Sequence, residues 1–199
     1  KVLENNADLG IAVDPDVDRL VFMCENGVLF GEENTLVACA DYVLSKTPGT
    51  TVSNLSSSRA LNDVTQKYNQ DHFYSAVGEV NVVDKMKKHN AVIGGEGNGG
   101  VIYPESHYGR DSVVGIGLFL SLYVERGLSG SQLLETYPKY FMLKEKINLS
   151  PSLDVDKILK KIAEKYSNEK VDLVDGVRID FIDCWVQLRK SNTEPIIRI

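Results

Sequence analysis

The stretch "TVSNLSSSRALNDVTQKYNQDHFYSAVGEVNVVDKMKKHNAVIGGE", residues 51–96, decides the expected fold. Three short apolar runs typical of strands begin at Thr51, His72 and Ala91, and a helical pattern lies between each pair. Strands that alternate with helices indicate crossover connections, which produce a parallel sheet with helices on both faces. Another apolar helical pattern at 111–127 predicts a further, buried helix.

The flanking segments extend this pattern. We expect strands at 9–13 and 19–25, a helix at 33–45, an amphipathic helix at 152–168, and strands at 176–183 and 184–191. The sequence therefore predicts an α/β fold, with a mixed or parallel sheet and helices on both faces, followed by a smaller α+β domain. The expected domains are residues 1–47, 48–145 and 146–199.

The composition excludes several classes of protein. The net charge of −6 over 199 residues leaves no basic surplus to neutralise nucleic-acid phosphates. No apolar run approaches the roughly 18 residues of a membrane span. The three cysteines, Cys24, Cys39 and Cys184, have apolar neighbours, so we expect buried, reduced thiols and a cytoplasmic location. Because the chain starts at Lys1 and ends within an apolar run, we expect a fragment of a longer protein.

An acidic motif, "DPDVDR", follows the first expected strand. Asp14, Asp16 and Asp18 occupy alternate positions, so an extended chain would hold neighbouring carboxylates roughly 6.5–7 Å apart. Ligands of one Mg²⁺ must bring their oxygens to about 2.1 Å from the ion, so this segment must curl. A curled motif with three carboxylates and Arg19 beside them favours a magnesium site.

Three alternatives compete with magnesium on this stretch alone. An EF-hand shares the D-x-D-x-D start, but its sixth position needs glycine where this chain has Arg19. A phosphatase that phosphorylates a strand-end aspartate would show a similar start. An acidic, solvated turn stays open, although three crowded charges then have only Arg19 to offset them.

A glycine-rich segment, "GGEGNGG" at residues 94–100, follows the strand that ends the opening stretch. Its only side chains belong to Glu96 and Asn98, and a carboxylate with an amide suits the recognition of sugar hydroxyls. A flexible turn is the alternative. Phosphate binding is disfavoured because Glu96 would repel it.

The basic loop, "RKSNTEPIIR" at residues 189–198, combines guanidinium, hydroxyl and amide donors. Two arginines could grip a phosphate, and successive backbone N–H groups could form an anion nest. A polar turn before a final strand is the alternative. The candidate phosphate-binding residues are Arg189, Ser191, Asn192, Thr193 and Arg198.

Together these motifs resemble the α-D-phosphohexomutase family of phosphoglucomutases, phosphomannomutases and phosphoglucosamine mutases. "DPDVDR" is similar to its metal loop D-G-D-x-D-R, "GEGNGG" to its sugar-binding loop, and "RKSNTEP" to its phosphate-binding loop R-x-S-x-T-E-P. "AVGEVNV" and "DKMKKHN" fit the segment before the sugar loop. Pro15 replaces the usual glycine, and Asn98 and Gly100 replace a common Ser and His, which leaves the sugar open. "YGRDS" stands where the family often has an Asp-Gly pair, and Arg110 within it is assigned only a basic role.

The resemblance implies transfer of a phosphoryl group between C1 and C6 of a hexose phosphate, through an enzyme phosphoserine and a hexose bisphosphate. It implies Mg²⁺ on the three aspartates, with Arg19 as a catalytic positive group, sugar hydroxyls on Glu96 and Asn98, and phosphate on the basic loop. The Ser-His-Asn-Pro-like loop of the family's first domain does not occur here. We therefore expect a missing N-terminal domain and a chain that is inactive alone. A metal-dependent sugar phosphatase and a non-catalytic sugar-phosphate-binding module remain alternatives.

Overall fold

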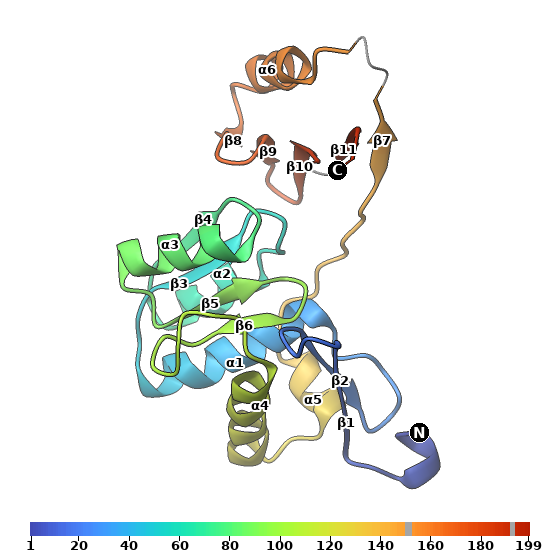
Figure 1. Ribbon diagram of the computed structural model, residues 1–199. Helices are drawn as coiled ribbons and strands as arrows, with labels where there is room; N and C mark the ends of the chain where they lie inside the picture. The colour runs from blue at the N-terminus through green and yellow to red at the C-terminus, as the bar shows by residue number, and fades with distance from the viewer. Residues whose placement is uncertain (150–152, 192–193) are drawn as a thin grey trace. The chain divides into compact units, whose positions relative to one another are not determined.

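The computed structural model describes residues 1–149, 153–191 and 194–199. It forms two compact units, Lys1–Tyr140 and Phe141–Ile199 (Figure 1). The predicted division between residues 47 and 48 does not separate two units here, and as an assignment of family domains it stays a prediction. Within the described residues, no helix combines the length and apolar character that a membrane crossing requires.

A four-stranded sheet organises the first unit. Its strands are β3 (Thr51–Asn54), β4 (His72–Ser75), β5 (Ile93–Glu96) and β6 (Gly100–Ile102), in the order β4-β3-β5-β6. As predicted, β3 pairs in parallel with β4 and β5, but β6 runs antiparallel to β5. The glycine-rich segment is thus the turn of a hairpin rather than a loop that leads to a helix. We call β5, residues 97–99 and β6 the glycine hairpin.

Helices cover both faces of this sheet, as expected. They are α1 (Glu32–Lys46), α2 (Ala60–Lys67), α3 (Glu79–His89) and α4 (Ser112–Arg126), whereas α5 (Gly130–Glu135) packs against α4 and β2. On one face, Val82 and Met86 of α3 pack against Val52 and Ile102. The other face belongs to a larger core, built from α1, α2 and α4 around Ile93; Figure 1 shows α3 and α1 on opposite sides of the sheet.

Helix α4 is less buried than its apolar sequence predicts. Leu118, Phe119 and Leu122 are buried, but Val113 and Val124 are 67% and 79% exposed. Within this unit α4 packs mainly against α1 and β6, and the side that carries Val113 and Val124 stays exposed. The local sequence does not predict which side is exposed, because α4 itself carries apolar residues on all of its sides.

The acidic motif lies at the turn of a second hairpin. Strands β1 (Leu9–Val13) and β2 (Leu20–Cys24) pair antiparallel with Val13 opposite Leu20, after a short 3-10 helix, η1 (Leu3–Asn5). Residues 14–19, which we call the acidic loop, connect the two strands. Because an antiparallel strand flanks this loop on each side, the helix-flanked EF-hand is excluded.

A half-buried carboxylate network joins the end of β2 to the start of α5. Glu25 accepts hydrogen bonds from the hydroxyl groups of Ser129 and Ser131 and from the Ser131 amide. The Ser131 hydroxyl is the largest cause that lowers the pKa of Glu25 to about 2, from the usual 4.5.

This network predicts acid sensitivity. Because the folded-state pKa is depressed, Glu25 stabilises the fold fully above about pH 4.5, and this contribution disappears as the pH falls toward 2. We expect Glu25→Gln to lower the free energy of unfolding by on the order of 1–2 kcal/mol at pH 7, and by much less near pH 2.5. Urea titrations at both pH values measure this, and an equal loss at both would contradict the assignment.

The second unit is α+β, as predicted. Its antiparallel sheet has the order β7-β11-β10-β9-β8, and Leu159 of α6 (Val155–Lys165) packs against Val177 and Ile179. The strands are β7 (Lys146–Asn148), β8 (Lys170–Asp172), β9 (Val177–Asp180), β10 (Trp185–Lys190) and β11 (Ile196–Arg198). Strands β7 and β8 were not predicted from the sequence because each is only three residues long. The prediction that Cys184 is buried was wrong, because that cysteine is exposed.

Candidate metal and sugar-phosphate site

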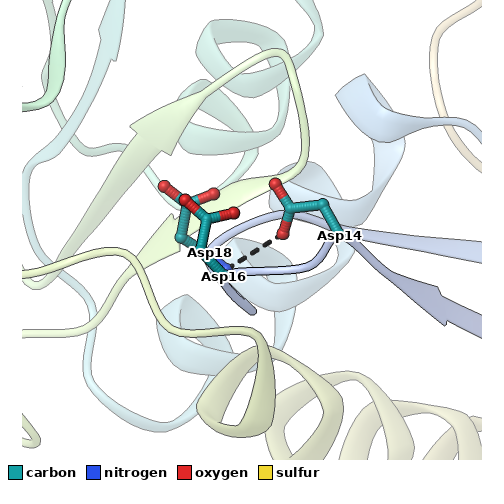
Figure 2. Close-up of side chains that lie close together, drawn as sticks. All are labelled: Asp14, Asp16 and Asp18. Carbon is teal, nitrogen blue, oxygen red and sulfur yellow. Dashed lines mark hydrogen bonds between the residues drawn. The ribbon is translucent and has the colours of Figure 1, made fainter.

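The three predicted metal ligands lie together at the turn of the β1–β2 hairpin. Asp14, Asp16 and Asp18 each offer a carboxylate oxygen, and these oxygens all lie within 4.8 Å of one another. Figure 2 shows the carboxylates of Asp16 and Asp18 side by side, with that of Asp14 beside them. The loop has therefore curled in the way that a shared cation requires.

Backbone hydrogen bonds hold this curl. Oδ1 of Asp14 accepts from the amides of Asp18, at 3.1 Å, and Arg19, at 3.0 Å. Val17, which lies between Asp14 and Asp18, has a φ of +59°, which a β-branched residue rarely adopts. Its carbonyl accepts a hydrogen bond from the Ser112 amide at the start of α4. Strain of this kind typically costs about 1–3 kcal/mol and is concentrated at functional sites.

The electrostatics of the loop leave room for a cation. Although burial raises the pKa of Asp14, the hydrogen bond from the Arg19 amide and those from its neighbours outweigh this, so its pKa lies below the usual range. Burial raises the pKa of Asp18, an effect that Arg110 opposes and that Asp16 reinforces. Oδ1 of Asp18 is inaccessible to water and has no hydrogen-bond partner within the described parts of the chain. Its contact with Nε of Arg19 is 3.7 Å long, so a cation would give this oxygen a close partner, and the donor set fits Mg²⁺.

Arg19 lies at the edge of the loop. Its Nε is 3.7 Å from one oxygen each of Asp14 and Asp18, and its side chain is 53% exposed. These long contacts do not lock the guanidinium, so it can turn toward a bound anion. The catalytic role expected for Arg19 stays a prediction.

The predicted sugar ligand Glu96 is deeply buried, with 4% of its surface exposed. Oε1 accepts from the Asn54 amide group at 2.7 Å and from the Gly78 backbone at 3.2 Å, and Oε2 pairs with Arg110 at 2.9 Å. Two carboxylate oxygens offer about four acceptor positions, so one remains for a sugar hydroxyl. Binding of sugar by Glu96 stays a prediction.

Asn98 lies in the turn of the glycine hairpin, where its Oδ1 accepts from the Gly100 amide at 3.2 Å. This turn touches the β1–β2 hairpin directly after the acidic loop, because the Leu20 amide at the start of β2 donates to the Gly99 carbonyl at 3.1 Å. The structure thus brings the candidate metal and sugar residues of the first unit together.

Arg110, to which the sequence alone assigns no definite role, joins the two motifs. Its guanidinium contacts Asp18 of the acidic loop, Glu79 of α3 and Glu96 of the glycine hairpin. A lone arginine between Gly109 and Asp111 carries no local signal of such contacts. Its partners are distant in sequence and meet only in the folded chain.

The basic loop belongs to the second unit. Arg189 of β10 lies directly opposite Arg198 of β11, so the two side chains project from the same face of the sheet. Arg198 pairs with Glu194 at 2.6 Å, and the buried Ser191 donates its amide to the Ile196 carbonyl. Asn192 and Thr193 lie outside the described residues. The phosphate-binding role of this loop stays a prediction.

Comparison with known proteins identifies the family. Residues 31–140 match the family described as "Phosphoglucomutase/phosphomannomutase, alpha/beta/alpha domain III". The chain is 39% identical over 197 residues to the phosphoglucosamine/phosphogalactosamine mutase of Sulfurisphaera tokodaii, which covers 96% of this chain. The chain belongs to the phosphoglucomutase/phosphomannomutase family. The predicted resemblance to phosphohexomutases is thereby confirmed.

Other members show how much of a phosphohexomutase is present. A phosphoglucomutase/phosphomannomutase of Thermococcus kodakarensis is 36% identical over 97% of this chain. A phosphoglucomutase/phosphomannomutase family protein from Burkholderia thailandensis has the same fold, with a TM-score of 0.82, 25% identity and 99% of this chain covered. The chain spans 43%, 42% and 43% of the lengths of the Sulfurisphaera, Thermococcus and Burkholderia proteins.

Proposed function

We propose that the parent protein is a phosphohexomutase that interconverts hexose 6-phosphate and hexose 1-phosphate. The observation that carries this proposal is the cluster of three carboxylates in the acidic loop, which Arg110 joins to the buried Glu96. Support comes from the 39% identity to a named phosphoglucosamine/phosphogalactosamine mutase. Because the chain covers less than half of that relative, we assign the activity to the parent and expect this chain alone to be inactive.

The residues of the first unit suit this chemistry. Asp14, Asp16 and Asp18 would hold Mg²⁺, which when bound neutralises charge that develops on a transferring phosphoryl group. Arg19, exposed and loosely held, would add a positive group beside that phosphoryl. Glu96 and Asn98 would bind sugar hydroxyls and so orient the hexose.

The basic loop of the second unit would bind the phosphate that is not reacting. Arg189 and Arg198 supply charge, and Ser191, Asn192 and Thr193 supply hydroxyl and amide donors. The partners are a hexose phosphate and a hexose bisphosphate, and the phosphoryl group passes through a phosphoserine in another part of the parent. We place the parent in the cytoplasm.

Phosphorus NMR on the parent protein tests this proposal. With Mg²⁺, a catalytic amount of hexose bisphosphate and glucose 1-phosphate, we expect the 6-phosphate signal to grow without release of inorganic phosphate. Chelation of Mg²⁺ should stop the reaction. Steady release of inorganic phosphate without need of bisphosphate would favour a phosphatase. No turnover of glucose, mannose or glucosamine phosphates would favour a binding module.

Metal binding by this chain provides the second test. We expect calorimetry with Mg²⁺ to show saturable binding that Asp16→Ala weakens at least tenfold, because a carboxylate ligand is lost. Asp84→Ala removes the same charge from the exposed side of α3 and should bind Mg²⁺ as the wild type does. Equal affinity in the wild type and Asp16→Ala would contradict the metal site.

A further inference from the structure

We propose that Arg110 is a positioning residue that holds Asp18 in the orientation that binds metal and ties the acidic loop to the glycine hairpin. This inference rests on the proposed function, because it assumes that Asp18 is a metal ligand. It assigns a specific role to a residue that lies outside the family motifs by which the site was first recognised.

Three carboxylates surround the guanidinium of Arg110. Arg110 contacts Asp18 through one terminal nitrogen, Glu96 through the other, at 2.9 Å, and Glu79 through Nε, at 3.2 Å. Its backbone amide also donates to Glu79, at 3.0 Å. These acids come from three separate segments, so the guanidinium cross-links three parts of the fold.

The side chain of Arg110 is held firmly in place. Its side chain is only 15% exposed, and its backbone forms an antiparallel bridge with Ile102 of β6. The aliphatic stem passes close over Gly100, where an added Cβ would lie 2.5 Å from Cδ of Arg110. The planar, always charged guanidinium is therefore fixed in one place, and a lysine ammonium cannot reproduce its divergent donors.

The two oxygens of the Asp18 carboxylate have different surroundings. Arg110 engages Oδ2, whereas Oδ1 is buried without a hydrogen-bond partner in the described structure. A contact that fixes one oxygen of a carboxylate and leaves the other for a cation is the usual arrangement behind a metal ligand. Arg110 thus selects the rotation of Asp18 that a metal ion needs.

Positioning and simple charge predict opposite effects on metal affinity. Arg110 is positive, so its removal should strengthen the binding of a dication if charge alone mattered. If Arg110 positions Asp18, its removal should weaken that binding, and loss of such supporting contacts typically costs about 10–100-fold in affinity. The sign of the change therefore separates the two roles.

The experiment measures Mn²⁺ affinity of this chain by the loss of the free-ion EPR signal, with Mg²⁺ competition as a check. We expect Arg110→Gln to weaken Mn²⁺ binding by about tenfold or more. Arg110→Lys keeps the charge but not the fork, and it should also weaken binding. Arg126→Gln removes the same charge at the far end of α4, where the arginine pairs with Asp41 at 3.1 Å, and it should leave binding unchanged.

A double variant shows whether Arg110 acts through Asp18. In an Asp18→Asn background, Arg110→Gln should cause no further loss of Mn²⁺ affinity, because the group that it positions is gone. Circular dichroism confirms that each variant is folded, and Arg110→Lys, which keeps a charge among the acids, serves if Arg110→Gln unfolds.

The outcomes separate this inference from the proposed function. If the wild type binds Mn²⁺ no better than Asp16→Ala does, the metal site itself fails. If Asp16→Ala weakens binding but Arg110→Gln and Arg110→Lys bind as tightly as the wild type or more tightly, only the positioning role is overturned. A further loss from Arg110→Gln in the Asp18→Asn background would also overturn it.

Discussion

Replacement of Gly99 by alanine should lower the free energy of unfolding by about 2–5 kcal/mol and weaken metal binding at the acidic loop. Gly99 has a φ of +89°, where an L side chain is strained, and an added Cβ would lie 2.3 Å from the Leu20 carbonyl oxygen. Relief of that clash must move the backbone, because the Leu20 oxygen is a main-chain atom and the position of the alanine Cβ is fixed by its own main chain. The Leu20 amide would then lose its hydrogen bond to the Gly99 carbonyl, which joins the start of β2, next to the acidic loop, to the glycine hairpin.

Gly117→Ala is the matched control for this prediction. Gly117 lies within α4, and an added Cβ would find no atom within 4 Å. Because alanine favours a helix over glycine by about 1 kcal/mol, this variant should be as stable as the wild type or more stable. Urea unfolding and Mg²⁺ calorimetry on both variants provide the measurement. A Gly99→Ala chain with wild-type stability and affinity would contradict the close approach of the two hairpins.

Phe119→Ala should destabilise the first unit by about 3–5 kcal/mol. Phe119 of α4 is fully buried, stacks on Phe22 of β2 with ring centroids 3.7 Å apart, and meets the edge of Phe30 at 5.0 Å. Truncation removes this aromatic surface from the core and leaves a cavity between α4 and β2. Since β2 directly follows the acidic loop, metal affinity should fall as β2 loosens.

Phe141→Ala removes the same side chain from a position where it is fully exposed. We expect its effect to lie within about 0.5 kcal/mol, as for most surface substitutions. Thermal unfolding followed by circular dichroism compares the two variants. Similar melting temperatures for both would show that α4 does not hold β2 in place.

The order of helices and strands in residues 51–96 was predictable from local patterns. Each strand there is a short apolar run, and each helix has its own period, so neighbours in sequence carry the signal. The departures have physical reasons as well. Strand β6 is only three residues long and follows several glycines, and the exposed side of α4 depends on what packs around it rather than on its own residues.

The candidate site divides in the same way. The spacing of Asp14, Asp16 and Asp18 was enough to predict a shared cation, because all three ligands come from one turn of the chain. Folding alone reveals that Arg110 joins Asp18 to Glu79 and Glu96, since these residues come from segments far apart in sequence. A motif records residues that lie close along the backbone, whereas ion pairs and burial depend on distances in space, which only the packed chain sets.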